Sequence, residues 1–191
     1  MKLLPLLIFS AILFACNSRP HQNTNAAPDI DTAKFYPLHS FFKEQIQYVD
    51  LRSFNIYKIT VKDGKKDSTG ISKDGFLAMA AIFLKRDLSD PNEKIRYKET
   101  VFQDLSTGSI TFNYTPIDPK ATVQNIDILL DEETHTVKRV FIRSVYTSGD
   151  STINEQCNWK AGMSFQVNRT ISTKTGYTST ELNYINWNDK P

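Results

Sequence analysis

The feature that constrains the fold most is a change of hydrophobic period at Pro91. Before this residue two segments carry apolar side chains at every third or fourth position, and after it the apolar side chains recur at every second position to the end of the chain. A period of 3.6 predicts amphipathic helices, whereas a period of 2 predicts strands with one buried face. The chain therefore combines helices near its start with a long run of strands.

Two helices are predicted in the first half of the chain. The first begins at Pro37, which suits a first helical turn. Its apolar residues follow at helical spacing: Leu38, Phe41, Phe42, Ile46 and Val49. Residues 53–62 alternate as a strand, and the charged run at 63–70 predicts an exposed turn. Ser72 can cap the second helix, 73–88, which is apolar nearly all round and should be buried on more than one side.

Short loops separate the strands after Pro91, so we expect neighbouring strands to pair as an antiparallel meander. The expected strands are 95–105, 109–114, 126–130, 137–146, 153–159, 163–171 and 182–187. The predicted fold class is α+β: a curved antiparallel sheet of about seven or eight strands, packed on one or two N-terminal helices, with helix 73–88 on its concave face. A closed lipocalin-like barrel is the alternative, and the two preceding helices fit it less well. In the order of its elements alone, the layout is similar to the half-barrel of periplasmic lipoprotein carriers.

The first sixteen residues carry a charged start, an apolar run from Leu3 to Ala15 and then a cysteine. Leu13-Phe14-Ala15-Cys16 resembles the lipobox of bacterial lipoproteins, although Phe14 is bulkier than the residue usual there. The run is too short to cross a bilayer, which needs roughly 20 residues. An ordinary secretory leader is the alternative, and Leu13 argues against it because that cleavage site prefers small side chains.

The resemblance implies cleavage before Cys16, a diacylglyceryl thioether on its sulfur and an acyl group on its amine. Two or three acyl chains would anchor the protein firmly in the membrane, because each buried methylene group contributes about 0.8 kcal/mol of binding free energy. Asn17 stands where Asp would be the inner-membrane retention signal, so the resemblance implies an outer-membrane protein facing the periplasm. We therefore expect a signal peptide at 1–15, a lipidated cysteine with a flexible tether at 16–33, and one α+β domain at 34–191.

Composition and motifs argue against several function classes. The formal net charge is +2, which gives no sign of nucleic-acid binding. The three histidines, His21, His39 and His135, show no metal-ligand spacing. The sequence has no GxSxG motif and no glycine-rich nucleotide-binding pattern, and Cys157 alternates with apolar residues like a buried small hydrophobe. We predict no metal, no cofactor and no enzymatic activity.

Three charged residues lie on the apolar parity of predicted strands: Glu99, Glu155 and Arg169. A lone buried charge costs several kcal/mol, so each must be paired, hydrated in a cavity or placed at a strand end. One interpretation is that they supply polar contacts to a ligand cavity. The other is that they form cross-strand pairs at the margin of the sheet, which twisted sheets expose.

Two functions remain open. The first is a structural or protein-interaction role for an envelope lipoprotein, in which helix 73–88 fills the space over the sheet. The alternative is a binding module that holds an apolar ligand or lipid between sheet and helix. Its contacts would come from Met79, Phe83, Phe112, Trp159 and Phe165. The volume left between helix and sheet distinguishes them, because ligand pockets run to about 300 Å³ or more.

Overall fold

A computed structural model describes residues 35–189 of the chain. Contacts divide the chain into residues 1–30 and residues 31–191, and the whole described core lies in the second unit. This unit therefore contains the hydrophobic core that it needs to fold on its own. The expected signal peptide, Cys16 and the tether lie outside the described residues. Within residues 35–189, no helix combines the length and the apolar character that a membrane span requires.

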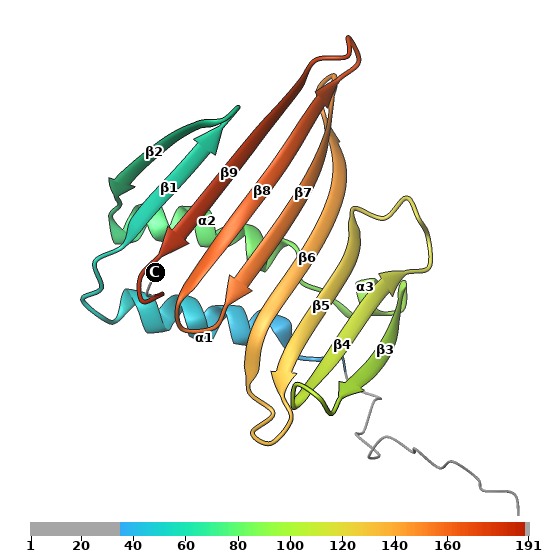
Figure 1. The fold of residues 1–191 in the computed structure, drawn as a ribbon. Helices are drawn as coiled ribbons and strands as arrows, with labels where there is room; N and C mark the ends of the chain where they lie inside the picture. Colours follow the sequence, from blue (N-terminus) through green and yellow to red (C-terminus); the bar gives the residue numbers. More distant parts are fainter. Residues whose placement is uncertain (1–34, 190–191) are drawn as a thin grey trace, which may run out of the picture. The chain divides into compact units, whose positions relative to one another are not determined.

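The described residues form three helices and one nine-stranded antiparallel sheet (Figure 1). The helices are α1 (Leu38–Asp50), α2 (Lys73–Lys85) and α3 (Pro91–Lys94). The strands are β1 (Tyr57–Lys62), β2 (Lys65–Gly70), β3 (Tyr97–Asp104), β4 (Ser109–Pro116), β5 (Val123–Asp131), β6 (Val137–Ser148), β7 (Ser151–Lys160), β8 (Ser164–Thr173) and β9 (Thr178–Asn186).

The strand order is β2-β1-β9-β8-β7-β6-β5-β4-β3, so the strands from β3 to β9 form the expected meander. The sheet is open, with β2 and β3 at its edges. The α+β class and the curved antiparallel sheet are confirmed, and the closed-barrel alternative is wrong because the two edge strands do not pair with each other.

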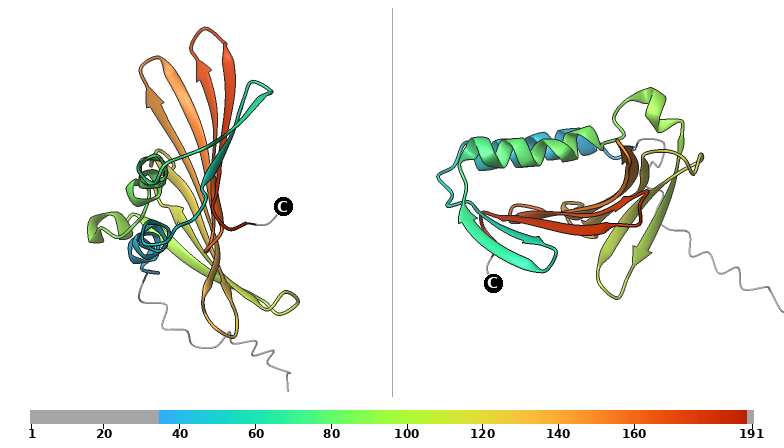
Figure 2. Two further views of the ribbon diagram at one scale, coloured as in Figure 1. Left: turned by 90° about the vertical axis from the view of Figure 1, so that its left-hand side faces the viewer. Right: turned by 90° about the horizontal axis from the view of Figure 1, so that it is seen from above.

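Helices α1 and α2 lie side by side against one face of the sheet (Figure 2). The strand alternation predicts this burial correctly. In β6, Val140 and Ile142 are buried on the helix side, whereas Phe141 and Val145 are exposed on the opposite side. We call that opposite side the outer face of the sheet.

Helix α2 begins as predicted and ends earlier than predicted. The Ser72 hydroxyl accepts a hydrogen bond of 3.1 Å from the Gly75 backbone N–H, which caps the first turn. The helix ends at Lys85 rather than at 88. Phe76, Ala80 and Phe83 are fully buried, and most other apolar side chains of α2 are partly buried: Leu77, Met79, Ala81, Ile82 and Leu84. Because α2 packs on the sheet and also on α1, the expected burial on more than one side is confirmed.

The predicted turn at 63–70 is a two-residue turn followed by the edge strand β2. Asp63 and Gly64 have φ angles of 47° and 81°, the left-handed values that a tight hairpin requires. The Asp63 carboxylate accepts hydrogen bonds from the Ser179 hydroxyl and the Thr180 backbone N–H, which ties this turn to β9. These bonds, that from the Thr180 N–H foremost, hold the pKa of Asp63 below its ordinary value.

The main core is a cluster of aromatic rings between the two long helices and the sheet. The Trp159 ring lies 4.8 Å from Phe83, 5.0 Å from Phe165 and 5.4 Å from Phe42, measured between ring centroids. All four side chains have no exposed surface. Such contacts between rings add to the gain from burying their area. The cluster fixes α1 and α2 on the sheet.

Candidate functional site

The structure brings together three of the five residues predicted to hold an apolar ligand. Phe83, Trp159 and Phe165 belong to the aromatic core and contact one another directly. Phe112 is buried elsewhere, 6.2 Å from the Tyr36 ring, and Met79 is partly exposed on α2. Because the rings fill the space between helix and sheet, an apolar ligand there would have to displace them.

Glu155 and Arg169 form a buried cross-strand pair. Glu155 has no exposed surface and stands opposite Arg169 in the β7–β8 register. One carboxylate oxygen lies 2.8 Å from the Arg169 Nε, and the other lies 3.2 Å from the Nε of Arg86 at the end of α2. The Tyr146 hydroxyl donates to the same carboxylate at 3.2 Å, and its ring faces the Arg86 guanidinium. These contacts satisfy Glu155 within the protein, and the bond from Arg86 joins the end of α2 to the sheet.

Glu99 has a different environment, near the edge of the sheet. It lies on β3 opposite Tyr114, and its Oε2 atom is buried without a hydrogen-bond partner in the described part of the chain. Burial raises the pKa of the Tyr114 hydroxyl, and a side-chain hydrogen bond to Glu99 and the charge of that carboxylate raise it further. Glu99 is therefore a partly buried acceptor beside the Tyr114 hydroxyl, and it can accept further hydrogen bonds.

The two described histidines and the free cysteine lie on three different parts of the fold: α1, the β5–β6 turn and β7. His39 pairs with Asp87, and His135 lies in the β5–β6 turn at a φ of 54°. No group of three or more His, Cys, Asp or Glu side chains converges among residues 35–189. Cys157 is buried, and burial raises the pKa of its thiol to about 12. The thiol is therefore protonated at neutral pH, and a protonated thiol is a poor nucleophile.

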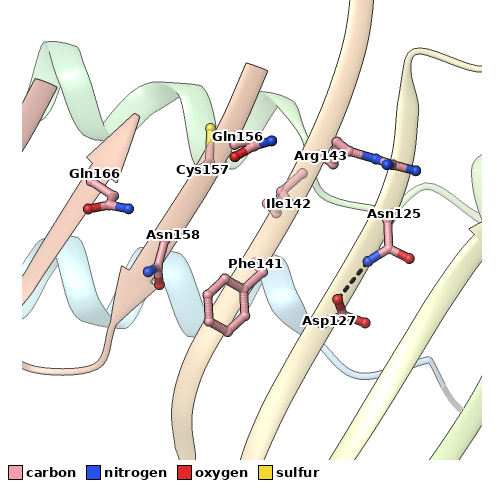
Figure 3. Close-up of a pocket in the computed structure, with 9 residues that line it drawn as sticks. All are labelled: Asn125, Asp127, Phe141, Ile142, Arg143, Gln156, Cys157, Asn158 and Gln166. Carbon is pink, nitrogen blue, oxygen red and sulfur yellow. Dashed lines mark hydrogen bonds between the residues drawn. The ribbon is translucent and has the colours of Figure 1, made fainter. Parts of the chain in front are cut away.

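A groove of about 420 Å³ opens on the outer face of the sheet, away from α1 and α2 (Figure 3). We call it the outer groove. Its side-chain walls come from four neighbouring strands, β5 to β8, and the backbone of β6 and β7 lies beneath them. The lining residues are Asn125, Asp127, Phe141, Ile142, Arg143, Gln156, Cys157, Asn158 and Gln166.

The register explains the shape of the outer groove. Asp127, Phe141, Asn158 and Gln166 are successive cross-strand neighbours and form one row across the sheet. A second row, two residues further along β6, contains Asn125, Arg143 and Gln156. Strand geometry separates the rows by about 6.6 Å and gives the four-strand row a length of about 14 Å. The groove is long enough for a short extended segment.

Several polar side chains of the outer groove have no hydrogen-bond partner. Within the described residues, no side-chain hydrogen bond involves Arg143, Gln156, Asn158 or Gln166. The Oδ1 atom of Asn158 is buried and unpaired. The amides can both donate and accept, and the Arg143 guanidinium donates only. Together they can bind a ligand that offers both donors and acceptors.

The remaining polar residues of the outer groove are held by one another. The Asp127 carboxylate accepts from Asn125 Nδ2 at 2.7 Å and from Asn113 Nδ2 at 2.6 Å. The Asn113 Nδ2 atom also donates to the side-chain Oδ1 atom of Asn125 at 2.8 Å. This network fixes one wall, while Phe141 of the first row, which is 40% exposed, offers an apolar surface. A fixed polar wall beside an exposed ring can contact a polar group and an apolar group of the same ligand.

The outer groove was not predicted from the sequence, because the side chains that line it lie on the strand face that the alternating pattern predicts to be exposed to solvent. One signal was present: amide residues recur on that parity in β7 and β8, at Asn154, Gln156, Asn158, Gln166 and Asn168. A solvent face has no need of so many amides. Comparison of the chain with models of known protein families, with curated proteins and with solved structures found no match.

Proposed function

We propose that this chain is a lipid-anchored, non-enzymatic protein of the bacterial envelope that binds a segment of a partner protein in the outer groove. The observation that carries the proposal is the set of unpaired amides and the free guanidinium around the exposed Phe141 ring. A peptide backbone offers one donor and one acceptor per residue, which matches side-chain amides. The Phe141 ring would contact an apolar side chain of the segment.

The proposed anchor is the lipid on Cys16, with residues 17–33 as the tether. A flexible chain of about 17 residues has a root-mean-square reach of roughly 20–25 Å. The proposed location is the outer membrane, facing the periplasm. A lipid anchor and a tether would hold the groove near the membrane and leave the domain free to meet its partner.

Changing Cys16→Ser is expected to release the protein from membranes, because the thioether that carries the lipid cannot form. The measurement is the distribution of the protein between supernatant and pellet after a high-salt wash of the envelope fraction. The unchanged chain, treated in parallel, should stay in the pellet. A mutant that remains in the washed pellet would contradict the lipid anchor and leave the groove proposal untouched.

A photo-crosslinking amino acid at position 141 is expected to capture a protein partner in the native envelope. The matched control is the same amino acid at Tyr177, which is 61% exposed at the distant β8–β9 turn. The adduct at 141 should weaken when Arg143→Glu or Asn158→Ala is added, because both changes remove groups that line the groove.

Two results would count against a protein segment in the groove. One is equal crosslinking at positions 141 and 177. The other is an adduct that neither groove substitution reduces. The alternative function, an apolar ligand between sheet and helix, predicts instead that native mass spectrometry of the purified protein shows a retained lipid, and that Phe83→Ala lowers its retention.

A further inference from the structure

Strand β3 forms one open edge of the sheet (Figure 1). In the described part of the chain it pairs with β4 alone, over all eight residues from Tyr97 to Asp104. Half of its backbone donors and acceptors therefore have no strand to bind. An open strand edge of this length can pair with a further strand.

The β3–β4 ladder identifies the unpaired backbone groups. The Ile117 backbone N–H donates to the Arg96 carbonyl at 2.8 Å, and the next pair joins Tyr97 to Pro116, which has no N–H. Hydrogen-bonded and non-hydrogen-bonded pairs alternate along an antiparallel ladder. The backbone groups of Tyr97, Glu99, Val101 and Gln103 therefore point away from β4, toward the open edge.

The two edges of the sheet differ in their side chains. The edge strand β2 has the sequence KKDSTG, without a single large apolar residue, which is typical of an edge protected against pairing. Phe102 on β3 is 65% exposed, and Leu105, the first residue after the strand, is 78% exposed. The β3 edge thus lacks the protection that the β2 edge has.

We propose that β3 pairs antiparallel with β3 of a second copy of this chain. The two-fold axis passes midway between Val101 and the partner's Val101, which stand opposite each other. This register places Lys98 opposite the partner's Asp104 and Thr100 opposite the partner's Phe102. On the helix side it places Tyr97 opposite the partner's Leu105. Each contact occurs twice, because the two-fold axis repeats it.

Charge complementarity selects this register among its neighbours. Moving the axis by one residue to Thr100 would put Lys98 opposite the partner's Phe102, and moving it to Phe102 would put Lys98 opposite the partner's Ser106. Only the axis at Val101 sets the lysine against an acidic residue. Opposite charges at directly facing positions stabilise a strand pair, and like charges destabilise it.

The same register brings a further donor to Glu99. It places Glu99, with its buried and unpaired Oε2, opposite the partner's Gln103. Gln103 donates one N–H of its amide to Glu132 at 2.5 Å, which leaves the second N–H of that amide free. An amide donor that reaches the Glu99 carboxylate would bind its Oε2 atom, for which the described residues show no hydrogen bond of good geometry.

The test uses the fragment 31–191, whose core is complete, carrying Val101→Cys. In the proposed dimer the two copies of residue 101 form a hydrogen-bonded antiparallel pair. The Cα atoms of such a pair lie about 5.5 Å apart, which suits a disulfide. The fragment's own Cys157 is buried and stays reduced. Mild oxidation should give a covalent dimer at least about fivefold faster than for Thr69→Cys on the β2 edge, the matched control. Equal rates at the two edges would overturn the proposal.

A second measurement does not depend on a new cysteine. Analytical ultracentrifugation of the unchanged fragment should show a concentration-dependent dimer. Lys98→Glu should raise its dissociation constant about tenfold, because two facing charge pairs become repulsive. Val101→Pro should abolish the dimer while circular dichroism stays unchanged, because the Val101 N–H points to the open edge, where proline is tolerated. A fragment that is monomeric at every concentration would contradict the proposal.

Discussion

Trp159→Ala is expected to lower the free energy of unfolding by about 3–5 kcal/mol, a large share of the 5–15 kcal/mol typical of a domain. The indole is fully buried, and its ring lies within 5.4 Å of the rings of Phe42, Phe83 and Phe165. These residues come from α1, α2 and β8, so truncation would leave a cavity where three elements meet. The surrounding elements cannot collapse into it without moving both helices.

Urea denaturation of Trp159→Ala, followed by circular dichroism, measures the loss from the shift of the transition midpoint. The matched control is Tyr177→Ala, which truncates an aromatic ring that is largely exposed and should change stability by less than about 0.5 kcal/mol. A loss below about 1 kcal/mol at Trp159 would contradict its role in the core. Such a result would favour an apolar ligand site between sheet and helix.

The sheet could be predicted in outline because its strands carry a strong alternating pattern. Strand β6 shows this well: Val140 and Ile142 face the helices, and Phe141 and Val145 face away, as the period of 2 requires. Strand β2 could not be predicted, because its six residues are all exposed and contribute no apolar signal. In the described part of the chain it is held by backbone pairing with β1, which the sequence does not encode as a pattern.

The Glu155–Arg169 pair was within reach of the sequence. Both residues lie on the apolar parity, and each is seven positions from Gly162, which has a left-handed φ of 69° in the turn. Counting outward from a symmetric turn therefore places them opposite each other. Arg86 was not predictable in the same way, because only the packing of α2 on the sheet brings it to the carboxylate.

The outer groove depends on register rather than on parity. Its two rows form only when β5, β6, β7 and β8 are aligned, and the β5–β6 pairing contains two irregularities, between Val123 and Asn125 and between Leu129 and Leu130. Such bulges shift which residues stand opposite one another. Counting outward from the regular β6–β7 and β7–β8 turns places Phe141, Asn158 and Gln166 in one row. The same counting cannot place Asn125 and Asp127, because the β5–β6 register is shifted.

Glu155→Gln is expected to destabilise the protein by about 2–4 kcal/mol. Removing one partner of a buried ion pair costs about 3–5 kcal/mol when the remaining charge is fully buried. Here two guanidinium groups, those of Arg86 and Arg169, would face each other without a carboxylate between them. The Arg86 side chain is 19% exposed and the Arg169 side chain is 29% exposed, so hydration of the two guanidinium groups offsets part of the lost stability. The amide preserves the volume, which limits the effect to charge.

The matched control for Glu155→Gln is Asp150→Asn. Asp150 pairs with Lys174 at 3.0 Å, but the two side chains are 84% and 79% exposed, and exposed pairs contribute about 0–1 kcal/mol. Urea denaturation of both variants therefore compares a buried charge with an exposed one on the same strand scaffold. Equal losses in the two variants would contradict the assignment of Glu155 as the residue that joins α2 to the sheet. A large loss of stability in Glu155→Gln alone would indicate that the buried carboxylate has a structural role, which requires no bound ligand.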